Sequence, residues 1–117
     1  MRFLFAGTVD LGEVINYYFT LGRLLDCNVV GYDYSGFGIS TGTHTEDNLL
    51  DDCETVFNHM VEKLGIKKFK IVLQGQSLGT IAATHLASKH KVAGCILISP
   101  FLKLINHFKS SFFSKHR

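Results

Sequence analysis

Apolar and polar positions follow two patterns along this chain. Short apolar runs bounded by glycine or polar residues are typical of buried strands. They cover residues 2–6, 28–33, 71–73 and 92–99. Between them, apolar residues recur every three or four positions, as on one face of a helix. These helical segments cover residues 11–25, 43–64 and 80–90.

The ends of the predicted helices carry their own signals. Asp10 with Glu13, and Thr43 with Glu46, have the spacing of capping boxes, and Gly65 ends the second helix. Four strands that alternate with three helices predict an α/β fold with a mostly parallel sheet and right-handed crossovers. In such a sheet, the residues that follow the strands gather at one edge.

One strand-to-helix connection carries candidate chemistry. The run 71–73 stops at glycine, and Ser77 lies between Gly75 and Gly79 just before the third helix. A serine at so sharp a turn has strained backbone and needs neighbours with almost no side chain. The segment Gly75-Gln76-Ser77-Leu78-Gly79 therefore fits a nucleophile elbow, in which the Leu78 N–H points at a developing oxyanion. The alternative is an incidental turn serine.

Length and composition predict a single domain. The chain has 117 residues, 46% of them apolar, which is enough for one core. We expect residues 1–102 to form this core. Residues 103–117 form a basic, apolar tail, which favours a cover for the core or the sheet edge over a membrane-surface helix. No apolar run fits a signal peptide or a bilayer span, so the default is a cytoplasmic protein.

Charge and cysteines exclude several kinds of site. The net charge is +2, but no Asp or Glu follows Glu62. No nucleic-acid reader motif accompanies the basic second half, so nucleic acid is not an expected partner. Cys27, Cys53 and Cys95 are far apart, which fits a reducing compartment and predicts no metal site. No cofactor is expected. The glycines of residues 34–42 lack the spacing of a dinucleotide-binding loop.

Three stretches together resemble a known family. They are Val9-Asp10-Leu11-Gly12, residues 33–42 (DYSGFGISTG) and residues 75–80 (GQSLGT). In this order and spacing they resemble alpha/beta hydrolases of the abhydrolase domain-containing protein 17 type, with Bem46-like relatives. The resemblance covers roughly residues 3–102 and implies a partial alpha/beta-hydrolase fold.

The resemblance also implies an activity. That group consists of serine hydrolases that remove palmitate from cysteine thioesters on membrane-associated proteins. By resemblance, Ser77 is the nucleophile, Leu78 supplies an oxyanion N–H, and the loop with Tyr34, Ser35, Gly36 and Phe37 walls the acyl site. The implied partner is an acylated protein or a small ester or lipid, with peripheral membrane contact.

The chain departs from the family pattern in three places. The first strand is not followed by a His-Gly-Asn segment, so Gly7 or Thr8 stands in as the second oxyanion donor. We expect no counterpart of the family's cysteine-rich amino-terminal anchor in this sequence. No acid follows Ser77, although the family order is serine, acid, histidine. A minor alternative is that Asp33, with His44 or His107, substitutes for the acid and histidine that would activate Ser77.

Two functional hypotheses therefore stand. The first is an ester or acyl-thioester hydrolase that forms an acyl-enzyme on Ser77. The second is a shortened, catalytically incomplete homologue, either a binding module or a partial gene product. In both, the hydrophobic strand at 92–99 is expected to leave an unpaired sheet edge through which the protein associates with itself.

Overall fold

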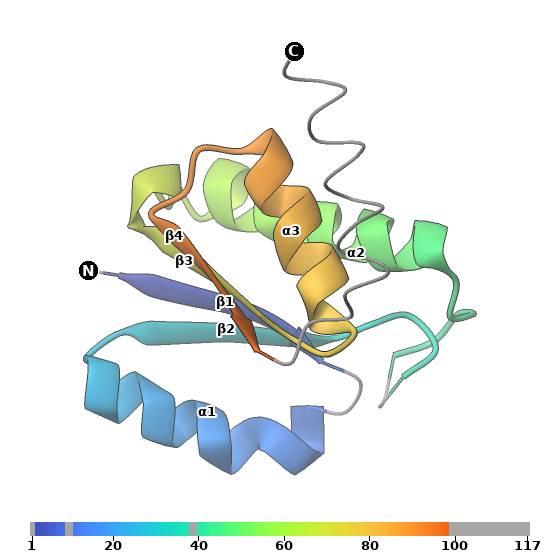
Figure 1. Cartoon of the computed structure of the whole chain (residues 1–117), viewed down its shortest axis with the longest axis horizontal. Coiled ribbons are helices and arrows are strands. Elements are labelled where there is room, and N and C mark those ends of the chain that lie inside the picture. The colour runs from blue at the N-terminus through green and yellow to red at the C-terminus, as the bar shows by residue number, and fades with distance from the viewer. Residues whose placement is uncertain (1, 9–10, 38–39, 99–117) are drawn as a thin grey trace.

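The protein is a parallel sheet with helices on both faces. In the computed structural model, residues 2–8, 11–37 and 40–98 are described. The sheet has four parallel strands in the order β2-β1-β3-β4 (Figure 1). Their bounds are Phe3–Thr8 for β1, Asn28–Asp33 for β2, Ile71–Gln76 for β3 and Gly94–Ile98 for β4. This confirms the predicted α/β fold with about four strands.

Three helices cover the sheet. Helix α1 (Leu11–Leu25) lies against one face, while α2 (Glu46–Asn58) and α3 (Gly79–Lys89) lie together on the other (Figure 1). A π-helical turn, His59–Lys63, continues α2, and Gly65 follows it with a φ of +68°. Glycine adopts this left-handed conformation without strain, so Gly65 ends the helix as predicted.

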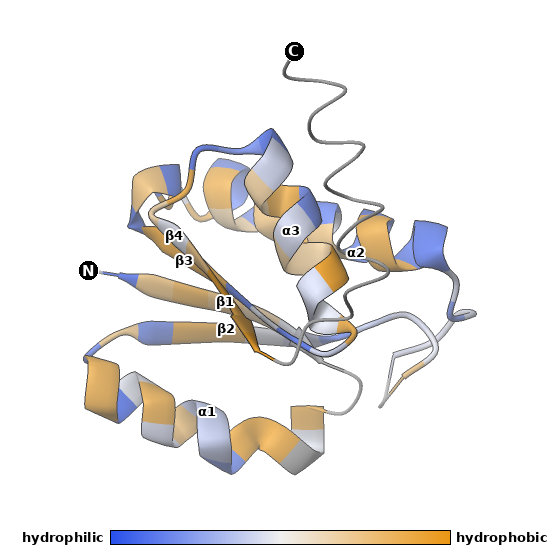
Figure 2. Ribbon diagram, viewed as in Figure 1, coloured by the Kyte–Doolittle hydropathy of each residue, from blue (hydrophilic) through white to orange (hydrophobic). Residues whose placement is uncertain are grey.

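The core lies between the sheet and the pair α2–α3. Central strand residues such as Phe5 and Leu73 pack there against Phe57 of α2 and Leu86 of α3. All four are buried. The opposite helix differs, because apolar residues occur along much of α1 (Figure 2) and Leu24 is 76% exposed. The predicted apolar stripe of α1 is therefore only partly buried.

The start of α2 corrects one prediction. Thr45, not Thr43, is the N-cap, and its side chain accepts a hydrogen bond from the Asn48 N–H at 3.0 Å. The Thr43 carbonyl instead accepts from the Asn48 side-chain amide at 2.7 Å. The capping box of Thr43 with Glu46 was thus wrong by two positions. Asp10, from the other predicted capping box, lies outside the described residues.

Strand β4 is an edge of the described sheet. Its residues Cys95, Ile96 and Leu97 are exposed, the latter two by 44% and 39%. Self-association through this edge stays a prediction. The predicted tail at 103–117 lies outside the described residues. Among the described residues, no helix is both long and apolar enough to cross a bilayer.

Candidate active site

Ser77 sits in a sharp turn between β3 and α3. The strand ends at Gln76 and the helix begins at Gly79, so only Ser77 and Leu78 connect them. Ser77 has a φ of 54°, in the left-handed region that few residues other than glycine adopt. Its side chain is exposed, and its N–H donates to the Ile98 carbonyl of β4 at 3.0 Å. This is the backbone path that a nucleophile elbow requires.

Close packing requires glycine at position 75 and favours it at position 79. A Cβ on Gly75 would collide with the Gly79 carbonyl oxygen and lie 2.7 Å from the Thr80 Cα. A Cβ on Gly79 would lie 3.0 Å from the Tyr34 hydroxyl oxygen. The turn is further held because the Thr80 hydroxyl donates to the Ser77 carbonyl at 2.6 Å. Leu78 is the N-cap of α3, so its N–H is one of the helix-start donors that have no partner within the helix.

A cavity of about 270 Å³ opens at Ser77. It brings together most of the residues predicted to form the site. The lining includes Gly7, Tyr34, Gln76, Ser77, Leu78 and Gly79. Gly7 and the elbow thus meet across the carboxyl edge of β1 and β3, where the candidate oxyanion donors were expected. Their catalytic roles remain proposals.

Helix α1 supplies lining residues that the sequence did not single out. Val14, Tyr17 and Tyr18 lie along the cavity, opposite the elbow. The sequence pattern placed Val14 and Tyr18 only on an apolar helix face, which does not distinguish a core from a cavity wall. One usable signal was that α1 starts just after β1, at the edge of the sheet where Ser77 lies.

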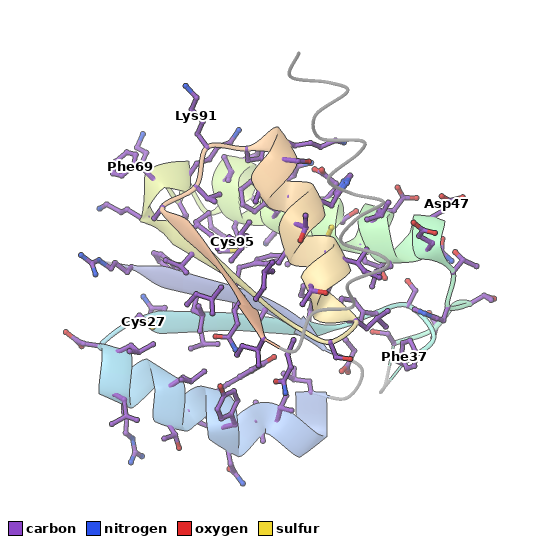
Figure 3. All side chains as sticks on the ribbon, viewed as in Figure 1. Cys27, Phe37, Asp47, Phe69, Lys91 and Cys95 are labelled. Carbon is purple, nitrogen blue, oxygen red and sulfur yellow. The ribbon has the colours of Figure 1, made fainter. Side chains whose placement is uncertain are left out.

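The rest of the predicted acyl-site wall lies elsewhere. Tyr34 lines the cavity, but Ser35, Gly36 and Phe37 do not. Ser35 is tied to α2, because its N–H and hydroxyl donate to the two Asp52 carboxylate oxygens at 2.6 and 2.8 Å. Phe37 projects from the loop after β2, at the opposite end of that strand from Cys27 (Figure 3). The loop is therefore anchored beside the cavity rather than lining it.

Asp33 and His44 have separate partners. One Asp33 carboxylate oxygen accepts the Leu11 N–H at 2.5 Å, where it satisfies the first turn of α1. His44 is exposed, and its ring lies 4.4 Å from that of Phe37. The structure thus gives no support to an improvised Asp33–His44 pair. His107 lies outside the described residues.

Tyr34 and Tyr32 place two buried hydroxyls beside the site. Tyr34 is 1% exposed, and the two rings meet edge to face with centroids 5.5 Å apart. Burial raises the pKa of both hydroxyls, with the charges of neighbouring groups adding to the effect. Both phenols therefore remain protonated at neutral pH and can act as hydrogen-bond donors.

A separate charged cluster joins α2 to α3. Glu54 lies 3.1 Å from the His85 Nε2, 3.3 Å from the His90 Nε2 and 3.4 Å from the Lys89 ammonium. None of these residues lines the Ser77 cavity. Within the described part of the chain, no three His, Cys, Asp or Glu side chains are grouped so as to hold a metal ion. The Glu54 cluster therefore stabilises the packing of two helices.

Replacing Glu54 by glutamine is expected to lower the free energy of unfolding by about 1 kcal/mol at pH 7. Burial alone would raise the Glu54 pKa, but the His90 hydrogen bond and the Lys89 charge lower it overall from 4.5. Because the folded-state pKa is lowered, the ionised Glu54 contributes its full stabilisation above pH 4.5. This stabilisation is lost as the pH falls through the lowered pKa. Urea unfolding across pH should show the Glu54→Gln difference shrinking below pH 4.5, while the exposed Glu62→Gln control changes little. A constant difference would contradict this assignment.

Comparison with known proteins places this site in context. Residues 11–116 match a protein-family description, "Serine aminopeptidase, S33". The chain is 42% identical over 102 residues to alpha/beta hydrolase domain-containing protein aho-3 of Caenorhabditis elegans. It is 38% identical over 102 residues to human alpha/beta hydrolase domain-containing protein 17C. Both alignments cover 87% of this chain and 31% of the relative.

A solved structure shares the fold. The alpha-beta hydrolase from Vibrio vulnificus superposes with a TM-score of 0.60 over 93% of this chain, at 21% sequence identity. The alignment covers 47% of that protein. The chain thus spans about half of this structure, and 31% of the length of the two curated relatives.

Proposed function

Because the chain belongs to the serine aminopeptidase S33 family of alpha/beta hydrolases, we propose that it carries the nucleophile half of a serine hydrolase site. The single observation that carries this proposal is the backbone at Ser77. A left-handed, exposed serine between a strand and a helix, over a cavity of about 270 Å³, costs stability. Such strain is retained where it presents a reactive hydroxyl.

The proposed reaction is acyl transfer to Ser77. Its Oγ attacks the acyl carbonyl carbon, the new Oγ–C bond forms, and the bond from that carbon to the leaving oxygen or sulfur breaks. The hydroxyl proton passes to a general base and then to the leaving group. Water later hydrolyses the acyl-enzyme by the reverse route. The candidate base His107 lies outside the described residues.

We propose an acyl thioester or ester as the substrate. The cavity combines the apolar side chains of Val14 and Leu78 with the aromatic rings of Tyr17 and Tyr18, which suits an acyl chain near its carbonyl end. By resemblance to the protein 17 group, a palmitoylated protein is the proposed natural substrate. Peripheral contact with a membrane then follows from the location of such substrates.

A second candidate function rests on a different observation. No histidine or acid in the described ranges lines the Ser77 cavity. A serine without a general base is a weak nucleophile. The alternative is therefore a domain that binds acylated ligands in this cavity without turning them over.

Labelling with a fluorophosphonate probe tests the proposed function. We expect the 117-residue chain to be labelled covalently, and Ser77→Ala to lose all labelling, because only the activated hydroxyl attacks phosphorus. The control is Ser88→Ala, which removes a hydroxyl of α3 that does not line the cavity. Intact-mass spectrometry and circular dichroism check the adduct and the fold. Folded wild-type protein without an adduct would favour the binding module instead.

A further inference from the structure

Tyr34 lies between the two backbone segments of the candidate oxyanion site. It follows β2, and its side chain reaches under the ends of β1 and α3. A Cβ on Gly7 would collide with the Tyr34 ring, and a Cβ on Gly79 would lie 3.0 Å from its hydroxyl oxygen. The Gly7 contact leaves no room for a side chain and the Gly79 contact leaves little, so both chain segments make space for this ring.

The Tyr34 hydroxyl is buried without a partner. Among the described residues, no group forms a hydrogen bond with it. Leaving such a group unpaired costs about 1–3 kcal/mol. Tyr34 nevertheless lines the same cavity as Ser77 and Leu78, so its ring lies beside the candidate oxyanion site. An oxygen that accumulates negative charge there would satisfy the phenol.

We propose that the Tyr34 hydroxyl donates a hydrogen bond to the acyl oxygen as Ser77 attacks, acting as an oxyanion donor beside the Leu78 N–H. This inference rests on the proposed function. Elsewhere in the family pattern a segment after the first strand supplies the second donor, but here that segment is short and Gly7 packs on the Tyr34 ring. The side chain of Tyr34, which directly follows β2, takes its place as a donor.

Two features suit Tyr34 to this task. The ring is 1% exposed and packed edge to face on Tyr32, so its position is fixed before the substrate binds. A donor that is already in place does not need to reorganise as charge develops. Burial also raises the pKa of the hydroxyl, which keeps its proton available over the working pH range.

The test compares Tyr34→Phe with Tyr32→Phe. Both variants remove a buried hydroxyl that has no partner among the described residues, but only Tyr34 lines the cavity. The readout is the second-order rate constant for labelling by an alkyl fluorophosphonate, whose phosphoryl oxygen takes the place of the acyl oxygen. In this step the Ser77 Oγ–P bond forms, fluoride leaves, and the serine proton goes to the base.

We expect Tyr34→Phe to label about 10²-fold more slowly than wild type, as for loss of one oxyanion donor. Tyr32→Phe should label within about twofold of wild type. Urea unfolding should show that neither variant is less stable, because each loses an unsatisfied polar group.

Other outcomes overturn the inference. Equal labelling rates for wild type and Tyr34→Phe exclude the hydroxyl as a donor, while Ser77-dependent labelling would leave the proposed function standing. Tyr34 has only a packing role if Tyr32→Phe slows labelling as much as Tyr34→Phe does. The same conclusion follows if Tyr34→Phe labels more slowly and also has a lower free energy of unfolding than wild type. Absence of labelling in the folded wild type removes the proposed function, and this inference with it.

Discussion

Gly75→Ala is expected to lower the free energy of unfolding by about 3 kcal/mol or more, the upper end for forced overpacking. The added Cβ would meet the Gly79 carbonyl and the Thr80 Cα, which are backbone atoms of the first turn of α3. A side chain could rotate away from such a contact, but a helix start cannot. Relief therefore requires α3 to move off the sheet and give up part of the core that Leu86 completes.

Urea unfolding followed by circular dichroism measures this effect. The matched control is Gly94→Ala, where the new Cβ at the start of β4 meets nothing within 4 Å. The free energy of unfolding of Gly94→Ala should stay within about 0.5 kcal/mol of the wild-type value. A Gly75→Ala protein as stable as Gly94→Ala would show that the elbow is looser than its geometry indicates. With a total stability of about 5–15 kcal/mol, the expected loss is a large share.

The elements with strong patterns were predicted well from the sequence. Helix α1 and strand β2 have the predicted bounds, 11–25 and 28–33. Both combine a clear period with sharp glycine or polar boundaries, so local preference and tertiary packing agree. Strand β3 runs to Gln76, beyond the predicted end at residue 73. Pairing with β4, in which Gly75 lies opposite Leu97, extends a strand that composition alone would end.

The start of α2 shows why a local motif can fail. Thr43 and Thr45 are both good caps, and only Thr43 has a Glu three residues later. The Asn48 amide bonds the Thr43 carbonyl outside the helix, while the Asn48 N–H bonds the Thr45 side chain. The cap at Thr45 is therefore accompanied by a second hydrogen bond, from the Asn48 side chain to the Thr43 carbonyl, which the capping-box rule does not consider.

The candidate site was predicted only where its residues adjoin a strand end. Gly7, Tyr34 and Ser77 follow or end parallel strands, and the cavity brings all three together. Tyr17 reaches the same cavity from α1, and no rule of spacing links it to the elbow. The unpaired state of the Tyr34 hydroxyl is likewise a property of packing, because it depends on which groups the fold leaves out of reach.

Phe57→Ala should have the largest effect on the core, lowering the free energy of unfolding by about 3–5 kcal/mol. Phe57 is fully buried, and its ring lies 6.0 Å from that of Phe5 on β1 and 4.4 Å from the imidazole of His90, the C-cap of α3. Truncation thus leaves a cavity where α2, α3 and the sheet meet.

The matched control for Phe57→Ala is Phe69→Ala, which makes the same chemical change outside the core. Phe69 is 67% exposed and points outward from the short turn before β3 (Figure 3). Its loss should cost less than about 0.5 kcal/mol in urea unfolding. Similar losses in the two variants would contradict the assigned core.

If Phe57→Ala alone is destabilised but keeps its Ser77 labelling at low temperature, the core and the elbow are separable. Loss of labelling in step with unfolding would instead show that α3, which begins at the elbow, needs Phe57 to hold its place.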